Sequence, residues 1–416
     1  MSAAVPGRLR AEVADTVEGM ARYLLGTADR ERSDRLWPAH FMVFATNPLN
    51  VAYGACGPAL FLHTAERAGG LPDDVRAWMR NRPLDLESYP PGLFPGLAGI
   101  AETFWRIGLA EEALDAMALL YRSPLLEAEP GLFLGAAGWG TVSLRFHART
   151  GDQVHLDAAV RAGEHLLATA EGRDGTCCWP YRAEGRVHYG LGYGASGIAL
   201  FLLRLALATG RGDFRSAAIR GLEFDLENRS DTEVGAQWRR FEDDMVRYPY
   251  LIHGSAGIGC VLLRFHRMLG DERYLALARR LADDAYLTYA LLPSLFEGMA
   301  GLGEFQLDMF RCTAGPRYLH RAFDIAETML MFRVERPEGV AFPGRVLNRI
   351  SADYATGAAG VGLYFTRLLS PGGMAFLDDD PPGAANGRAS RHNALGADAI
   401  RFTDPDPDPD PDSAPA

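Results

Sequence analysis

A short pattern of Gly, any residue, a small residue and Gly recurs seven times along this 416-residue chain. The copies begin at Gly54, Gly96, Gly135, Gly194, Gly254, Gly298 and Gly357. Successive copies lie between 39 and 60 residues apart, and each introduces an apolar run. Internal repetition at such a period indicates one architecture built by stacking similar units.

The third and fifth repeats show the unit most plainly. In the third, Gly135 opens the apolar run WGTVSLRFHART, Gly151 ends it, and Asp152 precedes the amphipathic segment HLDAAVRAGEHLLATA. The fifth repeats this plan with Gly270 and Asp271. An Asp at an N-cap followed by Leu and Ala at helical spacing predicts a second helix after the first. Each unit is therefore predicted to be a hairpin of an inner apolar helix and an outer amphipathic helix.

Seven such hairpins predict an all-α fold, and specifically an α/α toroid. Glycines at the start of each inner helix allow neighbouring backbones to approach closely at one rim. An open superhelix is the alternative, but the first and last motifs are nearly equivalent, whereas the ends of solenoids usually carry polar caps. Residues 1–50 are predicted to form an N-terminal helix and a lead-in loop, and residues 51–377 the toroid. The acidic, proline-rich residues 378–416 cannot bury apolar surface, so they are predicted to be a disordered tail.

Composition narrows the classes of function. The chain is 48% hydrophobic and 10% aromatic, which supports a large core. It has no unbroken apolar run of about 18 residues and no signal-peptide order at its start, so we expect a cytoplasmic protein that does not contact a membrane. The net charge of -11 and the absence of a basic cluster argue against nucleic-acid binding. All 42 basic residues are Arg, which excludes Lys chemistry.

The five cysteines are too irregularly spaced for a disulfide framework and are interpreted as reduced thiols. Cys177 and Cys178 are adjacent, whereas paired zinc-binding cysteines are normally separated by two or more residues. We therefore interpret this pair as part of a loop between hairpins.

The segments around the motifs resemble a known family. They include LWP and TNPLNVAYGACG, LFPGLAGIAE, PYLIHGSAGIG, SLFEGMAGLG and FPGRVLNRISADYATGAAGVG. Together they are similar to lanthionine synthetase C-like cyclases, in particular the cyclase domain of class III lanthipeptide synthetases, from about Leu36 to Leu377. The resemblance implies an α/α toroid that adds Cys thiols of a ribosomally made precursor peptide to dehydroalanine or dehydrobutyrine. The products are lanthionine and methyllanthionine thioether rings.

The chain departs from the zinc-dependent branch of that family. That branch places a Cys before Tyr-Gly in its fifth motif and a Cys-His pair before the Gly of its sixth. The corresponding positions here are Ile252 and the pair Phe296-Glu297, and Tyr193 stands where that branch often carries an active-site His. Class III cyclase domains also lack these ligands, so the resemblance implies a zinc-independent enzyme without a cofactor.

The residue before the first Gly of each motif is expected to face the rim of the central cavity, and three of these residues could handle protons. His253 is expected to titrate near neutral pH and to remove the proton of the Cys thiol. Glu297 could orient His253 or protonate the enolate carbon, and Tyr193 could donate a hydrogen bond to the enolate oxygen.

Two further candidates stand in the last repeat. Asp353 lies four residues before Gly357, and Arg349 lies a further four residues earlier, the spacing of one helical turn. The alternative for each of the five candidates is that it merely caps an inner helix, because such positions attract polar side chains.

Three functions remain open from the sequence. The chain shows neither the kinase motifs nor the lyase domain of class III enzymes, so we expect a stand-alone cyclase that works with separate kinase and lyase dehydration enzymes. The alternative is a non-catalytic ring that binds the precursor peptide and organises those enzymes. A glycoside-cleaving α/α-barrel ranks third, because it needs paired acids about 5 to 10 Å apart. Only Glu297 and Asp353 could serve in that role.

Overall fold

The computed structural model describes residues 7–65 and 70–378. Over these residues it contains fifteen α-helices and seven short strands, which confirms the all-α class. The described residues belong to one compact unit. The predicted disordered tail, residues 378–416, falls outside the described residues apart from Asp378.

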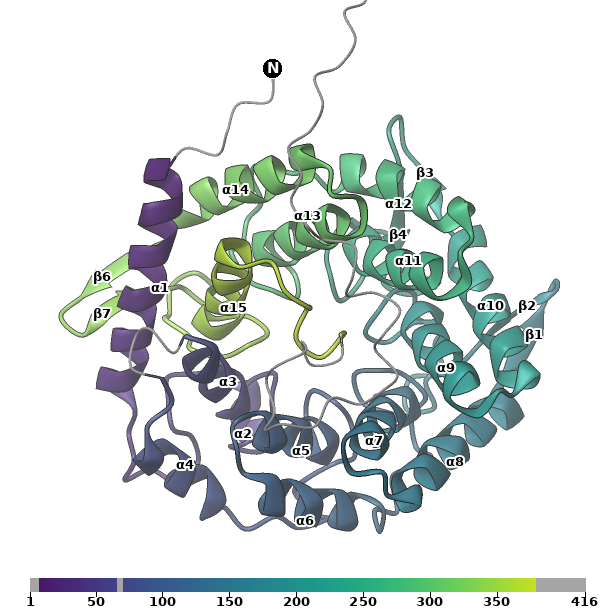
Figure 1. The fold of residues 1–416 in the computed structure, drawn as a ribbon, viewed down its shortest axis with the longest axis horizontal. Helices are drawn as coiled ribbons and strands as arrows, with labels where there is room; N and C mark the ends of the chain where they lie inside the picture. Colours follow the sequence, from purple (N-terminus) through teal and green to yellow (C-terminus); the bar gives the residue numbers. More distant parts are fainter. Residues whose placement is uncertain (1–6, 66–69, 379–416) are drawn as a thin grey trace, which may run out of the picture. The chain divides into compact units, whose positions relative to one another are not determined.

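The helices form two concentric rings, so the predicted toroid is confirmed (Figure 1). Each inner helix begins at a glycine motif. The inner helices are α3 (Cys56–Thr64), α5 (Leu97–Arg106), α7 (Ala136–Thr150), α9 (Ala195–Thr209), α11 (Ser255–Leu269), α13 (Met299–Thr313) and α15 (Ala358–Leu369). The ring closes because α15 packs against α3.

The outer helices run back between successive inner helices. They are α1 (Gly7–Thr27), α4 (Asp73–Arg80), α6 (Ala110–Leu120), α8 (Gln153–Thr169), α10 (Gly212–Glu227), α12 (Glu272–Asp284) and α14 (Pro316–Leu330). Helix α1 packs against α15 and α14, so the first helix of the chain supplies the outer partner of the last repeat. The predicted caps are confirmed: Asp152 accepts from the Val154 N–H at the start of α8, and Asp271 accepts from the Arg273 N–H at the start of α12.

A closed ring of backbone hydrogen bonds joins the seven repeats at one end. It runs through the residue two positions before the first Gly of each motif. These residues are Ala52, Phe94, Phe133, Gly192, Ile252, Phe296 and Ala355. Each donates its N–H to the carbonyl of the equivalent residue in the next repeat, over 2.8 to 3.2 Å, and Ala355 donates to Ala52. This hydrogen-bond ring excludes the open superhelix and fixes the register of all seven motif loops.

Buried charges line the bore of the inner ring. Five inner helices carry an Arg seven residues after the last Gly of their motif, and the sixth motif has Asp308 at that position. These arginines are Arg106, Arg145, Arg204, Arg264 and Arg367. Arg264 and Arg367 both pair with Asp308, and Arg367 also pairs with Glu304. These ion pairs therefore link α13 to its neighbours α11 and α15, in addition to the apolar packing between these helices.

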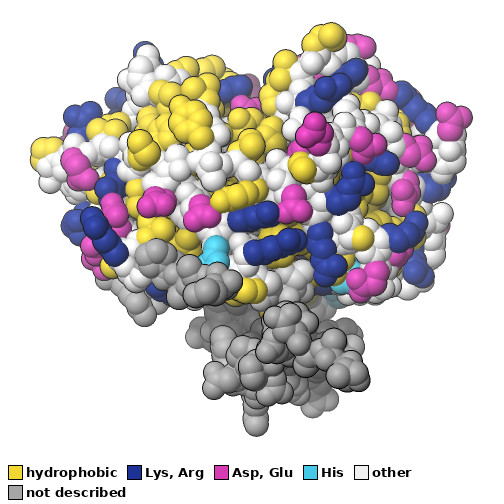
Figure 2. All heavy atoms as spheres, turned by 90° about the horizontal axis from the view of Figure 1, so that it is seen from above, with side chains coloured by type: hydrophobic (Ala, Val, Ile, Leu, Met, Phe, Trp, Pro, Cys, Tyr) yellow, Lys and Arg dark blue, Asp and Glu magenta, His cyan; other side chains and the backbone are white. Residues whose placement is uncertain are grey.

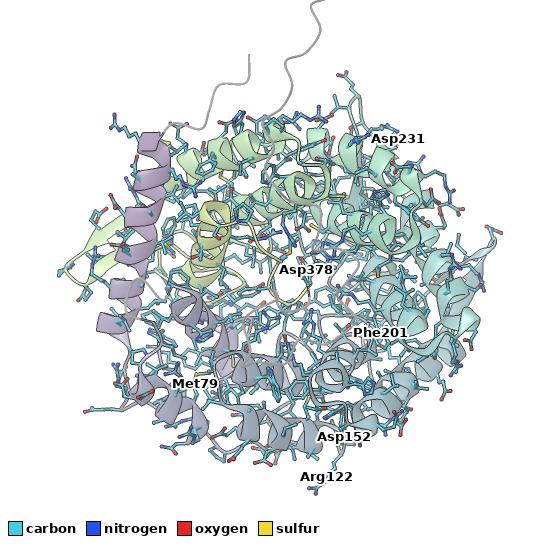
Figure 3. The ribbon with its side chains drawn as sticks, viewed as in Figure 1. Met79, Arg122, Asp152, Phe201, Asp231 and Asp378 are labelled. Atoms are coloured by element: carbon cyan, nitrogen blue, oxygen red, sulfur yellow. The ribbon has the colours of Figure 1, made fainter. Side chains whose placement is uncertain are left out.

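Residues 371–378, here called the strap, follow α15 into this bore, and Asp378 lies near the centre of the ring (Figure 3). The Asp378 carboxylate accepts from Arg264, 2.7 Å between Nη2 and Oδ2, and from Arg311, 3.1 Å between Nη1 and Oδ2. Arg145 donates to the Phe376 carbonyl over 2.8 Å. Asp378 was assigned to the tail on sequence, but it is buried because the arginines of the bore supply its counter-charge.

Short antiparallel strands and one further helix lie in the connections between the helices of the two rings. They are α2 (Met42–Ala45), β1 (Glu171–Arg173), β2 (Thr176–Cys178), β3 (Ser230–Asp231), β4 (Ala236–Arg239), β5 (Arg247–Tyr248), β6 (Val334–Arg336) and β7 (Gly339–Ala341). Cys177 and Cys178 lie in β2 and are buried, so the predicted loop is wrong at this point. In the part of the chain that the structure covers, no helix has the length and apolar character needed to cross a bilayer.

Candidate functional site

The candidate site lies at the end of the toroid where the inner helices begin. The residue before each motif follows the hydrogen-bond ring directly in the chain, so the ring sets its position. Tyr193, His253 and Glu297 come from the fourth, fifth and sixth motifs, whose inner helices α9, α11 and α13 are neighbours. The N-termini of these helices converge on the same rim, and each carries about half an elementary positive charge.

Tyr193 and His253 form a stacked pair. Their ring centroids are 5.2 Å apart with an interplanar angle of 9°, and Phe133 stacks on Tyr193 at 4.7 Å. The Tyr193 hydroxyl makes no hydrogen bond to any described residue. Burial raises the pKa of Tyr193 far above its ordinary value, with smaller contributions from Tyr53 and Glu297. Tyr193 therefore keeps its proton and can act only as a hydrogen-bond donor to a developing negative charge.

His253 does not titrate near neutral pH, so that expectation is wrong. Burial, the largest cause, and the neighbouring His188 and Arg240 together lower its pKa to about 3. The backbone of Tyr189 opposes this lowering of the pKa, and His253 Nδ1 is buried without a partner at hydrogen-bond distance and angle. His253 is a neutral imidazole at physiological pH, because its buried position disfavours the cation.

Glu297 does not orient His253. Its carboxylate instead pairs with Arg345, 3.1 Å from Oε2 to Nη2, in the loop before the seventh motif. No hydrogen bond joins Glu297 and His253 among the described residues, and stacking on Tyr193 holds the imidazole in place. Glu297 still contributes to the field of the site, since its charge raises the pKa of Tyr53, Tyr193 and Tyr250.

Both carboxylate oxygens of Asp353 accept hydrogen bonds from its own loop or from the segment next to it. Its Oδ1 accepts from the Thr356 N–H at 2.7 Å, Oδ2 accepts from the His40 N–H at 3.2 Å, and Ser351 also donates to it. Asn50 plays the same part in the first motif, where its Oδ1 accepts from the Tyr53 N–H at 2.7 Å. Asp353 therefore shapes the turn that leads into α15, but it does not cap that helix, whose N-cap Gly357 has no side-chain cap.

Arg349 is not brought to the site. It is exposed, and residues 343–350 form a bridged loop in which Pro343 pairs with Ile350. The expected helical turn between Arg349 and Asp353 is therefore wrong. The same loop instead brings Arg345 to Glu297.

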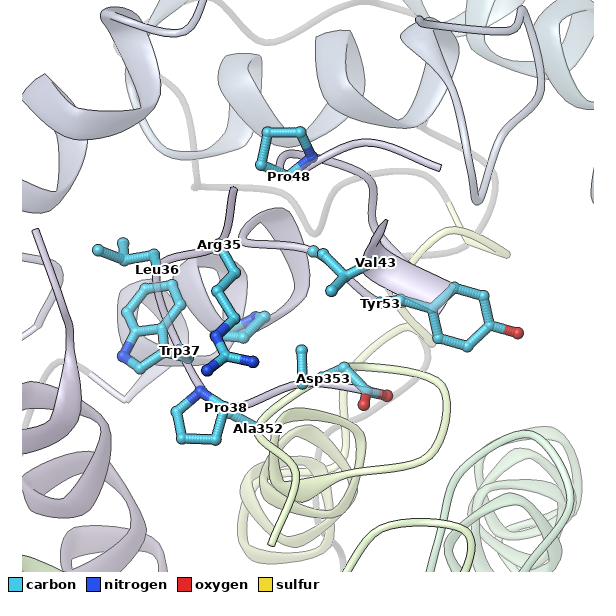
Figure 4. Close-up of a pocket in the computed structure, with 12 residues that line it drawn as sticks. Arg35, Leu36, Trp37, Pro38, Val43, Pro48, Tyr53, Ala352 and Asp353 are labelled. Atoms are coloured by element: carbon cyan, nitrogen blue, oxygen red, sulfur yellow. The ribbon is translucent and has the colours of Figure 1, made fainter. Parts of the chain in front are cut away.

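A small pocket lies where the first and last repeats meet (Figure 4). Its walls come from the lead-in segment, the first motif and the seventh motif, and Tyr53 and Asp353 both border it. Ala352 donates its N–H to the Pro38 carbonyl over 2.7 Å across this seam. Neither Tyr193, His253 nor Glu297 lines the pocket, so we attribute it to the closure of the ring.

Two residues that the sequence did not indicate are His188, whose ring stacks beside His253, and its partner Glu184. His188 Nε2 is 3.2 Å from Glu184 Oε2, and the His188 ring is 5.6 Å from Tyr193 and 6.5 Å from His253. Both residues stand in the irregular connection before the fourth motif, outside the spacing that identified the other candidates.

The residues at the expected zinc positions do not fit a zinc ion. Ile252 is buried and apolar, and Phe296 packs edge-on against Phe94 and Tyr354. Zinc in proteins is held by thiolate, imidazole and carboxylate groups, usually three or four of them. Over residues 7–65 and 70–378, no group of three or more His, Cys, Asp or Glu side chains could hold a metal ion.

Comparisons with known proteins agree with the fold and with the resemblance of the motifs. The model of the family described as lanthionine synthetase C-like protein matches residues 47–378. The probable SapB synthase of Streptomyces coelicolor is 33% identical over 387 residues, which cover 90% of this chain and 40% of that protein. The chain thus spans about two fifths of the length of this curated relative. The solved structure of nisin cyclase is similar in fold, with a TM-score of 0.59 and 14% identity over 78% of this chain and 89% of that chain. The chain belongs to the lanthionine synthetase C-like family.

Proposed function

We propose that this protein is a zinc-independent cyclase that forms thioether rings in a dehydrated precursor peptide. The observation that carries the proposal is the site itself, where a protonated Tyr193 and a neutral His253 stack at the rim on which the inner helices begin. Membership of the lanthionine synthetase C-like family supports a lanthipeptide-related cyclase.

The reaction needs no metal to proceed. A free Cys thiol has a pKa of about 8.5, so a few per cent is thiolate at pH 7, and the thiolate is a strong nucleophile. The thiolate attacks the β-carbon of the dehydroamino acid, the double-bond electrons move to the carbonyl, and an enolate forms. Tyr193 donates a hydrogen bond to the enolate oxygen, and the helix N-termini stabilise its charge. A proton then returns to the α-carbon, so the product is an isomer of the reactants.

The end of the toroid where the inner helices begin, here called the mouth, has a surface that suits a peptide substrate. Large exposed apolar side chains occur in the segments that lead into the motif loops. They are Phe41, Phe44, Met245, Val246, Leu287, Tyr289, Leu291, Val346 and Leu347. An edge-on view shows the unit hollowed at its upper edge with hydrophobic side chains on both sides of the hollow, whereas Arg and acidic side chains alternate below (Figure 2). Apolar surface around a cavity is typical of a binding site.

We propose that kinase and lyase activities dehydrate the precursor before cyclisation. The main alternative is a ring that only binds the peptide and organises those enzymes. The glycoside-cleaving alternative is weakened, because Glu297 is paired with Arg345 and Asp353 is used by its own loop.

Thiol alkylation separates catalysis from binding. A dehydrated peptide with free Cys is incubated with the protein and then treated with an alkylating reagent. A cyclase removes alkylatable thiols without changing the peptide mass, whereas a scaffold binds the peptide and leaves its thiols free. Four of the protein's own five cysteines are buried, so they contribute little to the signal.

Replacing Tyr193 with Phe is expected to slow ring formation about ten- to hundredfold, because a hydrogen bond to a charged group is worth about 1.5 to 3 kcal/mol. The apolar stack on Phe133 and His253 is kept, so folding should be unchanged. The matched control is Tyr286→Phe, which removes a hydroxyl that donates to Asp324 on the outer helix α14. Equal rates for both variants and the wild-type protein would remove Tyr193 from the mechanism.

A further inference from the structure

Three buried polar atoms without hydrogen-bond partners lie in one aromatic cluster behind the site. They are Tyr181 Oη, His188 Nδ1 and His253 Nδ1. The ring of His188 lies 5.0 Å from Tyr181, 5.6 Å from Tyr193 and 6.5 Å from His253. More than nine tenths of buried polar groups in proteins are paired, so such a concentration of unpaired atoms indicates a place where protons or a small polar group are accommodated.

The local fold connects His188 to the surface through Glu184. The Tyr189 N–H donates to the Arg240 carbonyl at 2.9 Å and the Glu242 N–H to the Val187 carbonyl at 3.2 Å, which fixes the strand-like segment that carries His188. A turn over residues 181–186 returns Glu184 to His188, where Oε2 meets Nε2 at 3.2 Å. The Glu184 side chain is half exposed, whereas only 8% of His188 is accessible.

The contact with Glu184 determines which nitrogen of His188 is free. A carboxylate accepts hydrogen bonds, so Nε2 carries a proton and Nδ1 of the neutral ring is an acceptor. Nδ1 is buried and has no hydrogen-bond partner. One water molecule between His188 Nδ1 and His253 Nδ1 would satisfy both nitrogens. His253 Nε2, which bonds to no described residue, is then free to accept the proton of the substrate thiol.

The charges around the pair favour a proton on His188 over one on His253. The titratable and charged groups that act on the two rings are Glu184, Arg186, Arg240, Asp244, Tyr181 and Tyr193. Burial, with Arg186 and Arg240, lowers the pKa of His188 below its ordinary value, and Glu184 opposes this through charge and a hydrogen bond. No carboxylate among the described residues bonds to His253, Asp244 acts on it only through its charge, and a proton on His188 disfavours a second one on His253.

We propose that Glu184, His188 and His253 form a proton relay from the protein surface to the reaction cavity, in which His188 stores the proton of the substrate thiol. The proposal rests on the proposed cyclase function. The thiol gives its proton to His253 Nε2, and the proton on His253 Nδ1 passes through the bridging water to His188 Nδ1. His188 becomes a cation paired with Glu184, and His253 stays neutral throughout. After the C–S bond forms, the reverse transfer delivers the proton to the enolate α-carbon.

The test variant is Glu184→Gln, which changes a half-exposed side chain, and the control is Glu233→Gln, a second exposed carboxylate. Removing the carboxylate weakens the cationic form of His188. The acidic limb of the kcat/KM profile for ring formation is therefore expected to move about one pH unit lower, with a lower plateau. The same shift is expected for the His188 imidazole in 15N NMR titrations of the free protein.

The NMR titration tests the link between Glu184 and His188 in the free protein, and the rate profile tests whether that link acts in the reaction. An NMR titration of His188 that is unchanged by Glu184→Gln overturns the relay, whether or not the protein cyclises peptides. A shifted titration with an unshifted rate profile removes the relay from the reaction. Wild-type protein that leaves all peptide thiols alkylatable contradicts the proposed function, even where the NMR shift is present. The Glu233→Gln variant should match the wild-type protein in both measurements.

Discussion

Replacing Gly99 with Ala is expected to lower the free energy of unfolding by about 3 kcal/mol, because the added methyl group has no space. A Cβ at Gly99 would lie 1.7 Å from the Leu93 carbonyl oxygen and 2.7 Å from Val51 Cγ2. The obstructing carbonyl belongs to the backbone just before Phe94, which is held in the hydrogen-bond ring. The loop can yield only if hydrogen bonds between repeats are broken.

Chemical denaturation followed by intrinsic fluorescence measures this effect. The matched control is Gly212→Ala at the start of α10, where an added Cβ meets no atom within 4 Å. This control should be neutral or slightly stabilising, since Ala restricts the unfolded chain more than Gly does. If the two variants unfold at the same denaturant concentration, close packing at the motif glycines does not hold the toroid together.

Replacing Glu102 with Gln is expected to cost a similar amount, about 3 kcal/mol, because it leaves buried arginines without their counter-charge. Glu102 is fully buried on α5. Its carboxylate contacts Arg106 and Arg149 at 2.7 Å and Arg145 at 3.5 Å. Burial alone would raise the pKa of Glu102, but these three arginines outweigh it and hold the pKa well below the ordinary range.

This depressed pKa determines how stability depends on pH. An ordinary carboxyl group has a pKa of about 4, and the folded protein keeps Glu102 ionised below that value. The unfolded chain therefore binds the proton first, so the contribution of Glu102 is complete above pH of about 4 and is lost as the pH falls toward the folded pKa. The stability difference between wild type and Glu102→Gln should narrow as the pH falls from about 5 to 2. An exposed control, Glu111→Gln, should be neutral, and a constant difference across this range would contradict the assignment.

The toroid could be predicted from the sequence because backbone geometry requires particular residues, glycine and capping Asp, where its helices begin. The glycine motifs mark the starts of the inner helices, and Asp152 and Asp271 mark the starts of two outer helices. The position of the hydrogen-bond ring, two residues before each motif, was not predicted. Its members include Ala, Phe, Ile and Gly, since backbone groups make the ring and the side chain leaves no pattern.

The candidate site was predicted less well for three physical reasons. The pKa of His253 depends on burial, which one sequence does not reveal. Asp353 is an acidic residue close to a motif and so could be taken for an acid–base catalyst. Its carboxylate instead accepts a backbone N–H in a turn, as the side chain of Asn50 does. His188 and Arg345 lie in irregular connections, where spacing carries no information about which side chains meet.

The most direct test of a zinc-independent cyclase is the rate of ring formation by protein depleted of metal. The protein is treated with a strong chelator, its zinc content is measured, and loss of peptide thiols is followed with and without added zinc. We expect ring formation at the same rate in both samples, with far less than one zinc ion per chain. Ring formation that appears only with stoichiometric zinc, or thiols that persist in both samples, would contradict this account.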